Sequence, residues 1–225
     1  MIDASIEWDI HGFSVVSRVL DAAGCEELAL AISDRDPSRG MRGLLAEPAC
    51  QALAVRLRTL ASLKLFLPVD SVVVQCTLFE KSPTKNWLVS PHQDLSIPVK
   101  ERVDAPGLSG WAEKDGHLFV QPPASVLEAL VAVRVHLDGG GPGAGSLRVV
   151  PGSHRFGRLD AAQATALRAQ VGEIAPEVPR GGAFVMRPLL LHASSKSIAP
   201  VHRRVLHFVF GPPSLPAGLE WADAR

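Results

Sequence analysis

The stretch GGGPGAGSLRVVPGSH, residues 139–154, places a glycine-rich loop before a short apolar run and a Pro-Gly turn. A phosphate-binding loop would end in Gly-Lys-Ser or Gly-Lys-Thr and would lead into a helix, but here the β-type run LRVV follows the glycines. We therefore interpret residues 139–145 as a connection between two strands and residues 151–152 as a turn. The stretch indicates a β-rich fold and disfavours a nucleotide-binding loop.

Similar β-type runs, separated by turns, occupy the chain on both sides of this stretch. One helix-like segment, residues 161–171, interrupts them. Strands this numerous, with so little helix between them, predict a mainly β barrel or double-sheet jelly roll and not a βαβ array. The predicted strands are residues 72–79, 118–120, 130–137, 147–150, 183–191 and 205–210.

The first third of the chain has a helical pattern instead. Residues 25–33 form a short apolar-rich segment, and residues 47–64 repeat leucine at helical spacing. We expect these helices, within about residues 1–68, to cover a jelly-roll core of about residues 70–211. The length fits a single domain that spans residues 1–225.

The composition is that of a soluble globular protein. Apolar side chains make up 47% of the 225 residues, and 23 basic residues balance 23 acidic ones. Nucleic acid is not an expected partner, because its binding depends on a clustered excess of Lys and Arg. The three cysteines show no C-x-x-C spacing, the N-terminus lacks a signal-peptide pattern, and no apolar stretch is long enough to span a membrane. We therefore predict a cytoplasmic protein without membrane contact.

Three side chains have the types and order of a metal site. His92 and Asp94, in the triplet His-Gln-Asp, project to one side if the segment is extended. His192 follows the run MRPLLL, where a buried ring nitrogen needs a partner. Two imidazoles and one carboxylate on one face of an octahedral ion form the facial triad of non-haem iron oxygenases. Arg203, 11 residues after His192, has the guanidinium fork that suits a distal carboxylate such as that of 2-oxoglutarate.

Together and in this order, the motifs resemble the phytanoyl-CoA dioxygenase family of Fe(II)/2-oxoglutarate oxygenases. The resemblance rests on His92-Gln93-Asp94, on the PGSH turn after the run LRVV, on His192 and on Arg203. It extends from about residue 72 to residue 210. It implies a double-stranded β-helix, which is a cupin-like jelly roll, with the metal at its mouth and helices covering it.

The resemblance also implies the reaction and the residues that carry it. The cofactor would be Fe(II), held by His92, Asp94 and His192 as catalytic ligands, and 2-oxoglutarate and O2 would be the cosubstrates. Arg203 would anchor the distal carboxylate of 2-oxoglutarate, with Ser194 and Gln75 as further contacts. Because Asp94 stands where halogenating relatives have a small residue, the implied activity is hydroxylation of an unactivated C–H bond of a small molecule, with release of succinate and CO2.

The run 130–137 departs from the family pattern at two positions. Arg134 stands where many relatives have Trp, His136 stands where they have a small residue, and strand alternation puts both on one face. We expect substrate contacts from Arg134, His136 and Trp87; the alternative for the first two is packing beneath the N-terminal helices. Trp111 is expected in a long loop that could act as a flap over the metal.

Two other classes of function fit the same residues. One is a jelly-roll protein that binds a ligand or metal without turnover, and the other is a cupin-like metallohydrolase that uses zinc. Neither would require the arginine at position 203 to hold a cosubstrate. The substrate, the position of oxidation and the oligomeric state are not indicated by the sequence.

Overall fold

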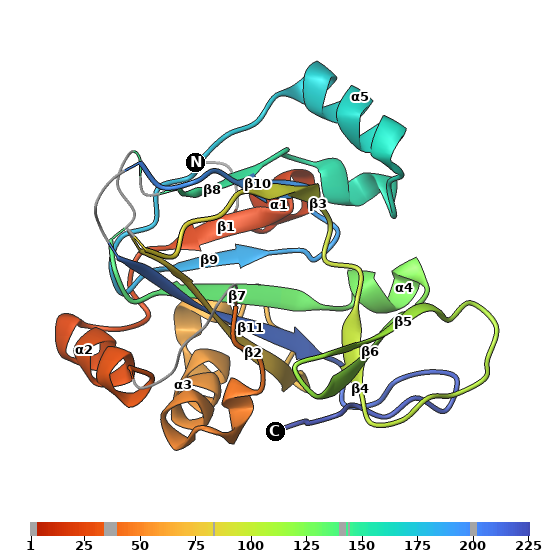
Figure 1. Cartoon of the computed structure of the whole chain (residues 1–225), viewed down its shortest axis with the longest axis horizontal. Coiled ribbons are helices and arrows are strands. Elements are labelled where there is room, and N and C mark those ends of the chain that lie inside the picture. The colour runs from red at the N-terminus through yellow and green to blue at the C-terminus, as the bar shows by residue number, and fades with distance from the viewer. Residues whose placement is uncertain (1–3, 34–39, 83, 140–142, 144, 199–201) are drawn as a thin grey trace.

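A computed structural model describes residues 4–33, 40–82, 84–139, 143, 145–198 and 202–225 of the chain. Its central feature is a five-stranded sheet that faces a smaller three-stranded sheet (Figure 1). Every strand pair in both sheets is antiparallel. The larger sheet has the order β1 (Phe13–Val16), β9 (Ala183–Met186), β7 (Val131–His136), β11 (Arg203–Gly211) and β2 (Val72–Lys81). The smaller sheet has the order β3 (Val89–His92), β10 (His192–Ser194) and β8 (Leu147–Val149).

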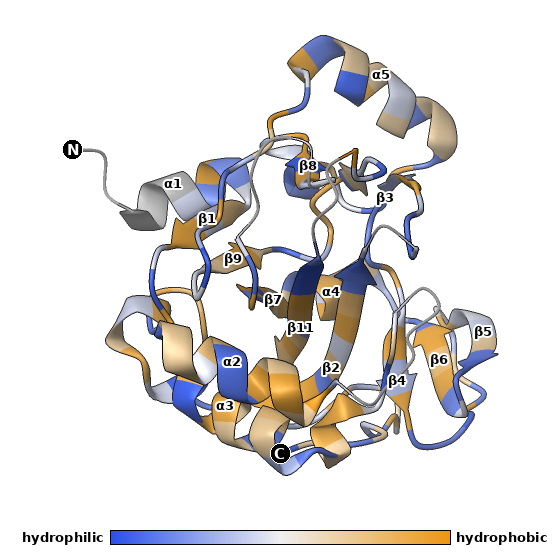
Figure 2. Ribbon diagram, turned by 60° about the vertical axis from the view of Figure 1, so that its left-hand side comes forward, coloured by the Kyte–Doolittle hydropathy of each residue, from blue (hydrophilic) through white to orange (hydrophobic). Residues whose placement is uncertain are grey.

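Alternation along β7 and β11 separates two environments. The residues Val131, Val133 and Val135 of β7 belong to the main hydrophobic core, in which the N-terminal helices also take part. These helices are α2 (Ala22–Ala31) and α3 (Pro48–Thr59), and they lie over the outer face of the five-stranded sheet (Figures 1 and 2). Arg134 and His136 alternate with the valines, so they point to the opposite face, toward the smaller sheet. The alternative in which these two residues pack beneath the helices is therefore wrong.

A third sheet closes one end of the molecule. It has the order β4 (Ile97–Val99), β6 (His117–Gln121) and β5 (Ser109–Lys114). Residues of this sheet pack with α4 (Ala124–Glu128) and with Trp221 near the C-terminus. Further short elements are α1 (Ala4–His11), η1 (Leu44–Ala46), η2 (Ala61–Leu63), η3 (Ser153–Phe156) and α5 (Ala161–Val171).

Several elements differ from the sequence prediction. The strand predicted over residues 183–191 ends at Met186, because Pro188 has no N–H for a ladder and residues 187–190 form a turn closed by a 3.0 Å bond from Leu190 N to Arg187 O. The predicted loop that holds Trp111 is largely strand β5, so the loop prediction is wrong. Trp111 is partly buried and packs against the core of the third sheet, and its role in a flap over the metal stays a prediction. The N-terminal third also contains a strand, β1, that was not predicted.

Two further sequence predictions concern membrane-spanning segments and the glycine-rich connection. Within the described residues, no helix is both long enough and apolar enough to cross a membrane. Most of the glycine-rich connection at residues 139–145 lies outside the described residues. Gly145 is described, with a φ of 67°, and a Cβ there would lie 2.6 Å from the carbonyl oxygen of Ser195. Only glycine therefore allows this close approach before β8.

Candidate metal centre

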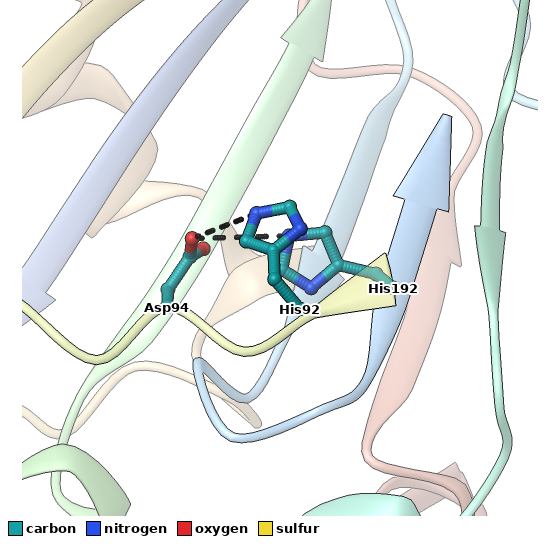
Figure 3. A group of neighbouring side chains, drawn as sticks. All are labelled: His92, Asp94 and His192. Carbon is teal, nitrogen blue, oxygen red and sulfur yellow. Dashed lines mark ion pairs between the residues drawn. The ribbon is translucent and has the colours of Figure 1, made fainter. Parts of the chain in front are cut away.

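The smaller sheet brings the three predicted metal ligands together. β3 pairs with β10 so that His92 lies directly opposite His192. Asp94 follows the end of β3, where its backbone N–H donates to Pro188 O at 2.9 Å. All three side chains point toward one another (Figure 3), and their ligand atoms all lie within 4.8 Å of one another.

Gln93 fixes the loop between the two ligands on the first segment. Its side chain is buried, and its amide nitrogen donates to Leu189 O and to Gly157 O, each at 2.7 Å. Its amide oxygen accepts from the backbone N–H of Leu159 at 2.8 Å. These bonds tie the segment that carries Asp94 to the segment that leads into His192.

Both histidines present the same nitrogen to the carboxylate. Nε2 of His92 lies 3.7 Å from Oδ1 of Asp94, and Nε2 of His192 lies 3.8 Å from the same oxygen (Figure 3). Nδ1 of each ring bonds to a backbone oxygen two residues earlier, Ser90 O at 2.9 Å and Leu190 O at 2.8 Å. A carbonyl oxygen only accepts, so Nδ1 carries the proton and Nε2 of the neutral ring has the free lone pair.

These distances and protonation states fit a metal ion. Two atoms that share one ion at ordinary ligand distances lie about 3 to 4 Å apart. Burial lowers the pKa of His192 to about 4, so the ring is neutral near pH 7. Burial alone would raise the pKa of Asp94, but electrostatic interactions with the surrounding imidazole groups and with Arg134 outweigh it, and the net shift is downward. The three groups are therefore in the forms that bind a cation.

A cavity of about 380 Å³ opens beside the three ligands, a size toward the small end for small-molecule sites. The ligands and most of the other predicted site residues line it: Gln75, Trp87, His92, Asp94, Arg134, His192, Ser194 and Arg203. His136 shares the inward face of β7 but is not among the residues that line the cavity. It lies one residue pair farther along the strand than Arg134, opposite Val205.

One end of the cavity combines cations with a hydroxyl group. Arg203 begins β11 directly opposite Lys81 of β2, and it is only 4% exposed. Lys81 donates to Ser194 Oγ at 2.7 Å and to Ser195 O, and Ser194 Oγ donates to Gly145 O at 2.8 Å. No carboxylate in the described part of the chain pairs with Arg203, and its Nε has no hydrogen-bond partner. Burial, followed by the charge of Arg134, lowers the pKa of Arg203 to about 10.

The floor of the cavity contains a second buried guanidinium group. Arg134 lies opposite His207 in the pairing of β7 and β11, and its Nη1 is 2.9 Å from Nδ1 of His207. A guanidinium only donates, so this histidine is neutral and carries its proton on Nε2. Burial and the charge of Arg134 lower the pKa of His207 to about 3, in agreement with that tautomer. Arg134 itself has a pKa lowered by burial to about 10, and its Nε has no hydrogen-bond partner.

The cavity is lined by more positive charge than the sequence predicted. Among the described residues that line it, the basic ones are Arg42, Lys81, Lys114, Arg134 and Arg203, and the one acidic residue is Asp94. Lys81 could have been predicted. It lies just past the end of the predicted strand, and alternation puts it on the same face as Gln75. Arg42 and Lys114 carried no such signal, since they reach the cavity from the segment before η1 and from the third sheet.

The comparisons with known proteins agree with this geometry. A family model described as Phytanoyl-CoA dioxygenase (PhyH) matches residues 8–205. No curated protein is significantly similar to the chain in sequence.

Solved structures with the same fold include several iron enzymes. EctD from S. alaskensis, in its apoform, is 21% identical with a TM-score of 0.70, over 100% of this chain and 84% of EctD. The epimerase SnoN from nogalamycin biosynthesis, in complex with Fe3+, alpha ketoglutarate and nogalamycin RO, is 14% identical with a TM-score of 0.70, over 97% and 87% of the two chains. HygX from Streptomyces hygroscopicus, with nickel and 2-oxoglutarate bound, is 20% identical with a TM-score of 0.64, over 94% and 87%. The predicted double-stranded β-helix with covering helices is thereby confirmed.

Proposed function

The chain belongs to the phytanoyl-CoA dioxygenase family, and we propose that it hydroxylates an unactivated C–H bond of a small molecule while converting 2-oxoglutarate and O2 to succinate and CO2. The family match confirms the predicted enzyme class, a 2-oxoglutarate-dependent oxygenase with iron as its metal. The reaction is balanced, because one oxygen atom of O2 enters succinate and the other enters the hydroxylated product. The site residues and their roles, described next, are part of the proposal.

The observation that carries the proposal is the arrangement of the three ligand atoms. Nε2 of His92 and Nε2 of His192 face the same oxygen of Asp94, and both rings are held in the ligand tautomer by backbone carbonyls. This donor set leaves half of an octahedral ion open, as an oxygenase requires. Fe(II) bound there supplies the activation of O2 that couples cosubstrate oxidation to C–H hydroxylation.

The residues around the open side have separate tasks. We assign the distal carboxylate of 2-oxoglutarate to Arg203 and Ser194, because Arg203 is a buried cation without a counter-ion among the described residues and Ser194 lies in the same cavity. The Ser194 hydroxyl would have to turn from Gly145 O to donate to that carboxylate. Lys81 orients Ser194 through its 2.7 Å bond. Gln75 is a further contact with the cosubstrate, and its amide nitrogen is fixed by a 3.0 Å bond to Thr77 Oγ1.

The substrate side of the cavity includes Arg134 and Trp87. Arg134 has a buried Nε without a partner, so it can donate to an oxygen atom of a bound molecule. Trp87 presents an aromatic ring to the cavity, 5.8 Å from Nζ of Lys81. His136 takes no part in this assignment, because it lies outside the cavity lining. A cavity of about 380 Å³ favours a small substrate over a bulky thioester.

An anaerobic titration tests the proposal. Addition of Fe(II) and then 2-oxoglutarate to the protein is expected to produce the weak visible charge-transfer band of a chelated 2-oxo acid, and admission of O2 is expected to yield succinate. Asp94→Ala should abolish both signals, whereas His202→Ala, which changes an exposed histidine near Glu80, should leave both intact. Absence of the band and of succinate in the unchanged protein would overturn the proposal.

A further inference from the structure

A second group of charges lies on the part of the cavity wall that the third sheet and the segment before η1 provide. This part, which we call the Phe119 wall, consists of Arg42, Lys114, Phe119 and Gln121. Nζ of Lys114 lies 5.1 Å from the centre of the Phe119 ring, and the guanidinium of Arg42 lies 5.8 Å from the same centre. Two cations from separate segments therefore meet at one aromatic ring inside the cavity.

The two cations differ in how they are compensated. Arg42 pairs with Asp115 at 2.8 Å, and that carboxylate is about half exposed. Lys114 is partly buried and has no hydrogen-bond or ion-pair partner among the described residues. Burial and the charge of Arg42 lower its pKa. The positive charge of Lys114 is therefore destabilised by desolvation and by repulsion from Arg42, and a bound anion would offset both effects.

The net charge of the cavity with Fe(II) and 2-oxoglutarate bound also favours an anionic ligand. Fe(II) and the dianion 2-oxoglutarate cancel each other, so neither changes the net charge of the cavity. Among the described residues, five basic residues and one acidic residue, Asp94, line the cavity, and one of the five, Arg42, is paired with Asp115. Lys81 and Arg134 already donate to protein atoms, and Arg203 is assigned to the cosubstrate. Lys114 is the cation of the lining that has no such bond.

We propose that the substrate is a small organic oxyanion, a carboxylate or a phosphate monoester, whose charged group binds Lys114 and Arg42 and whose apolar part lies along Phe119. This inference rests on the proposed function, since the rest of the molecule must extend from the Phe119 wall toward His92, Asp94 and His192. An amphipathic acid fits these surroundings, because the charged tip meets the cations and the carbon skeleton meets the ring.

The test measures binding to the full-length protein without turnover. Fe(II) and saturating 2-oxoglutarate are added anaerobically, which occupies the cosubstrate site, and the visible band confirms loading. Calorimetry then compares butyrate, hexanoate, benzoate and phenyl phosphate with their neutral partners butyramide, hexanamide, benzamide and phenol. We expect at least one anion to bind at least tenfold more tightly than its neutral partner. Whether the carboxylates or phenyl phosphate show the larger preference tells which of the two anions the site binds.

Variants at position 114 assign the preference to the Phe119 wall. Lys114→Met should reduce the preference to less than threefold, and Lys114→Arg should retain it because the charge is kept. Lys100→Met is the matched control: this lysine is exposed and pairs with Glu220 at 2.9 Å, outside the cavity. The preference of the Lys100→Met variant for anions should equal that of the unchanged protein.

The two possible failures are distinguishable. If the visible band forms but no anion is preferred, or if the preference survives in Lys114→Met, the anionic substrate is refuted while the proposed oxygenase stands. If the band does not form, the proposed function fails and this inference fails with it.

Discussion

Replacement of Arg203 by Met is expected to weaken the binding of 2-oxoglutarate and at the same time to stabilise the protein without cofactors. Arg203 is buried, has no carboxylate partner among the described residues, and lies beside the cations Lys81 and Arg134. Methionine carries no charge and replaces the aliphatic part of the arginine side chain without the desolvated guanidinium. Weaker binding together with higher stability is expected when an arginine serves to bind a ligand. Replacement of an arginine that stabilises the fold would lower stability instead.

The size of the stabilisation follows from the pKa. Burial, with a further contribution from Arg134, lowers the pKa of Arg203 by more than two units, to about 10. At about 1.4 kcal/mol for each pKa unit, the folded state bears a cost of about 3 kcal/mol for keeping this charge. Some favourable contacts of the guanidinium are lost with it, so we expect Arg203→Met to raise the free energy of unfolding by about 1 to 3 kcal/mol.

The effect on the cosubstrate has the opposite sign. Removal of one member of a buried, hydrogen-bonded charge pair costs about 2 to 5 kcal/mol of binding free energy. This corresponds to a rise in the dissociation constant of 2-oxoglutarate of about 30-fold to several thousand-fold. The affinity is measured anaerobically with Fe(II) present, from the visible charge-transfer band, and the stability is measured by urea unfolding of the protein without cofactors.

The neighbouring arginine supplies the control. Arg204 points away from the cavity and forms two bonds to Asp138, Nε to Oδ2 at 2.9 Å and Nη2 to Oδ1 at 2.8 Å. Arg204→Met should therefore lower stability and leave the affinity for 2-oxoglutarate unchanged. The reasoning is refuted if Arg203→Met changes that affinity less than threefold, or if it destabilises the protein as Arg204→Met does.

Three further predictions test the site and its surroundings. Asp94→Ala removes the one carboxylate of the metal site, so Fe(II) affinity should fall more than about a hundredfold while the protein stays folded, as metal analysis and circular dichroism will show. Ser194→Ala removes a hydroxyl donor that would have to exchange its bond to Gly145 O for one to the carboxylate, so the dissociation constant of 2-oxoglutarate should rise only about 3- to 10-fold in the anaerobic titration. Burial and the charges of Arg134 and Arg203 lower the pKa of His136 to about 3, so it is neutral in the folded state and takes up a proton on unfolding below about pH 6.5. Stability should thus fall as the pH drops from about 6.5 toward 4, and His136→Leu should reduce that slope by about 1.4 kcal/mol per pH unit in urea unfolding; an unchanged slope would contradict a buried neutral histidine.

The parts of the fold that could be predicted are those in which local pattern and burial agree. β7 and β11 are long apolar runs in the centre of the larger sheet, and both were predicted to within two residues. The grouping of His92, Asp94 and His192 as a candidate metal site could be predicted because His92 and Asp94 are close in sequence and His192 follows a buried run. The family resemblance placed Arg203 with them, and the structure brings all four residues to one cavity.

The parts that could not be predicted depend on pairing between distant segments. β1 has only four residues, and its partner β9 lies about 170 residues later in the chain, so no local signal marks it as a sheet edge. β5 contains glycine, glutamate and lysine, a composition that is typical of a loop, and it is a strand because it pairs with β6. Lys114 reaches the cavity on this strand, which explains why the sequence offered no reason to select it.

The distribution of charge gives the balanced composition a functional meaning. Basic and acidic residues number 23 each, yet five basic residues and one acidic residue line the cavity among the residues that the structure describes. A small organic acid that reaches the cavity meets these cations at short range, where each contact is strongest. Selectivity for an anionic substrate then comes from Lys114, Arg42 and Arg134, and it is expected to weaken as ionic strength rises, because Lys114 is only partly buried and the Asp115 partner of Arg42 is about half exposed.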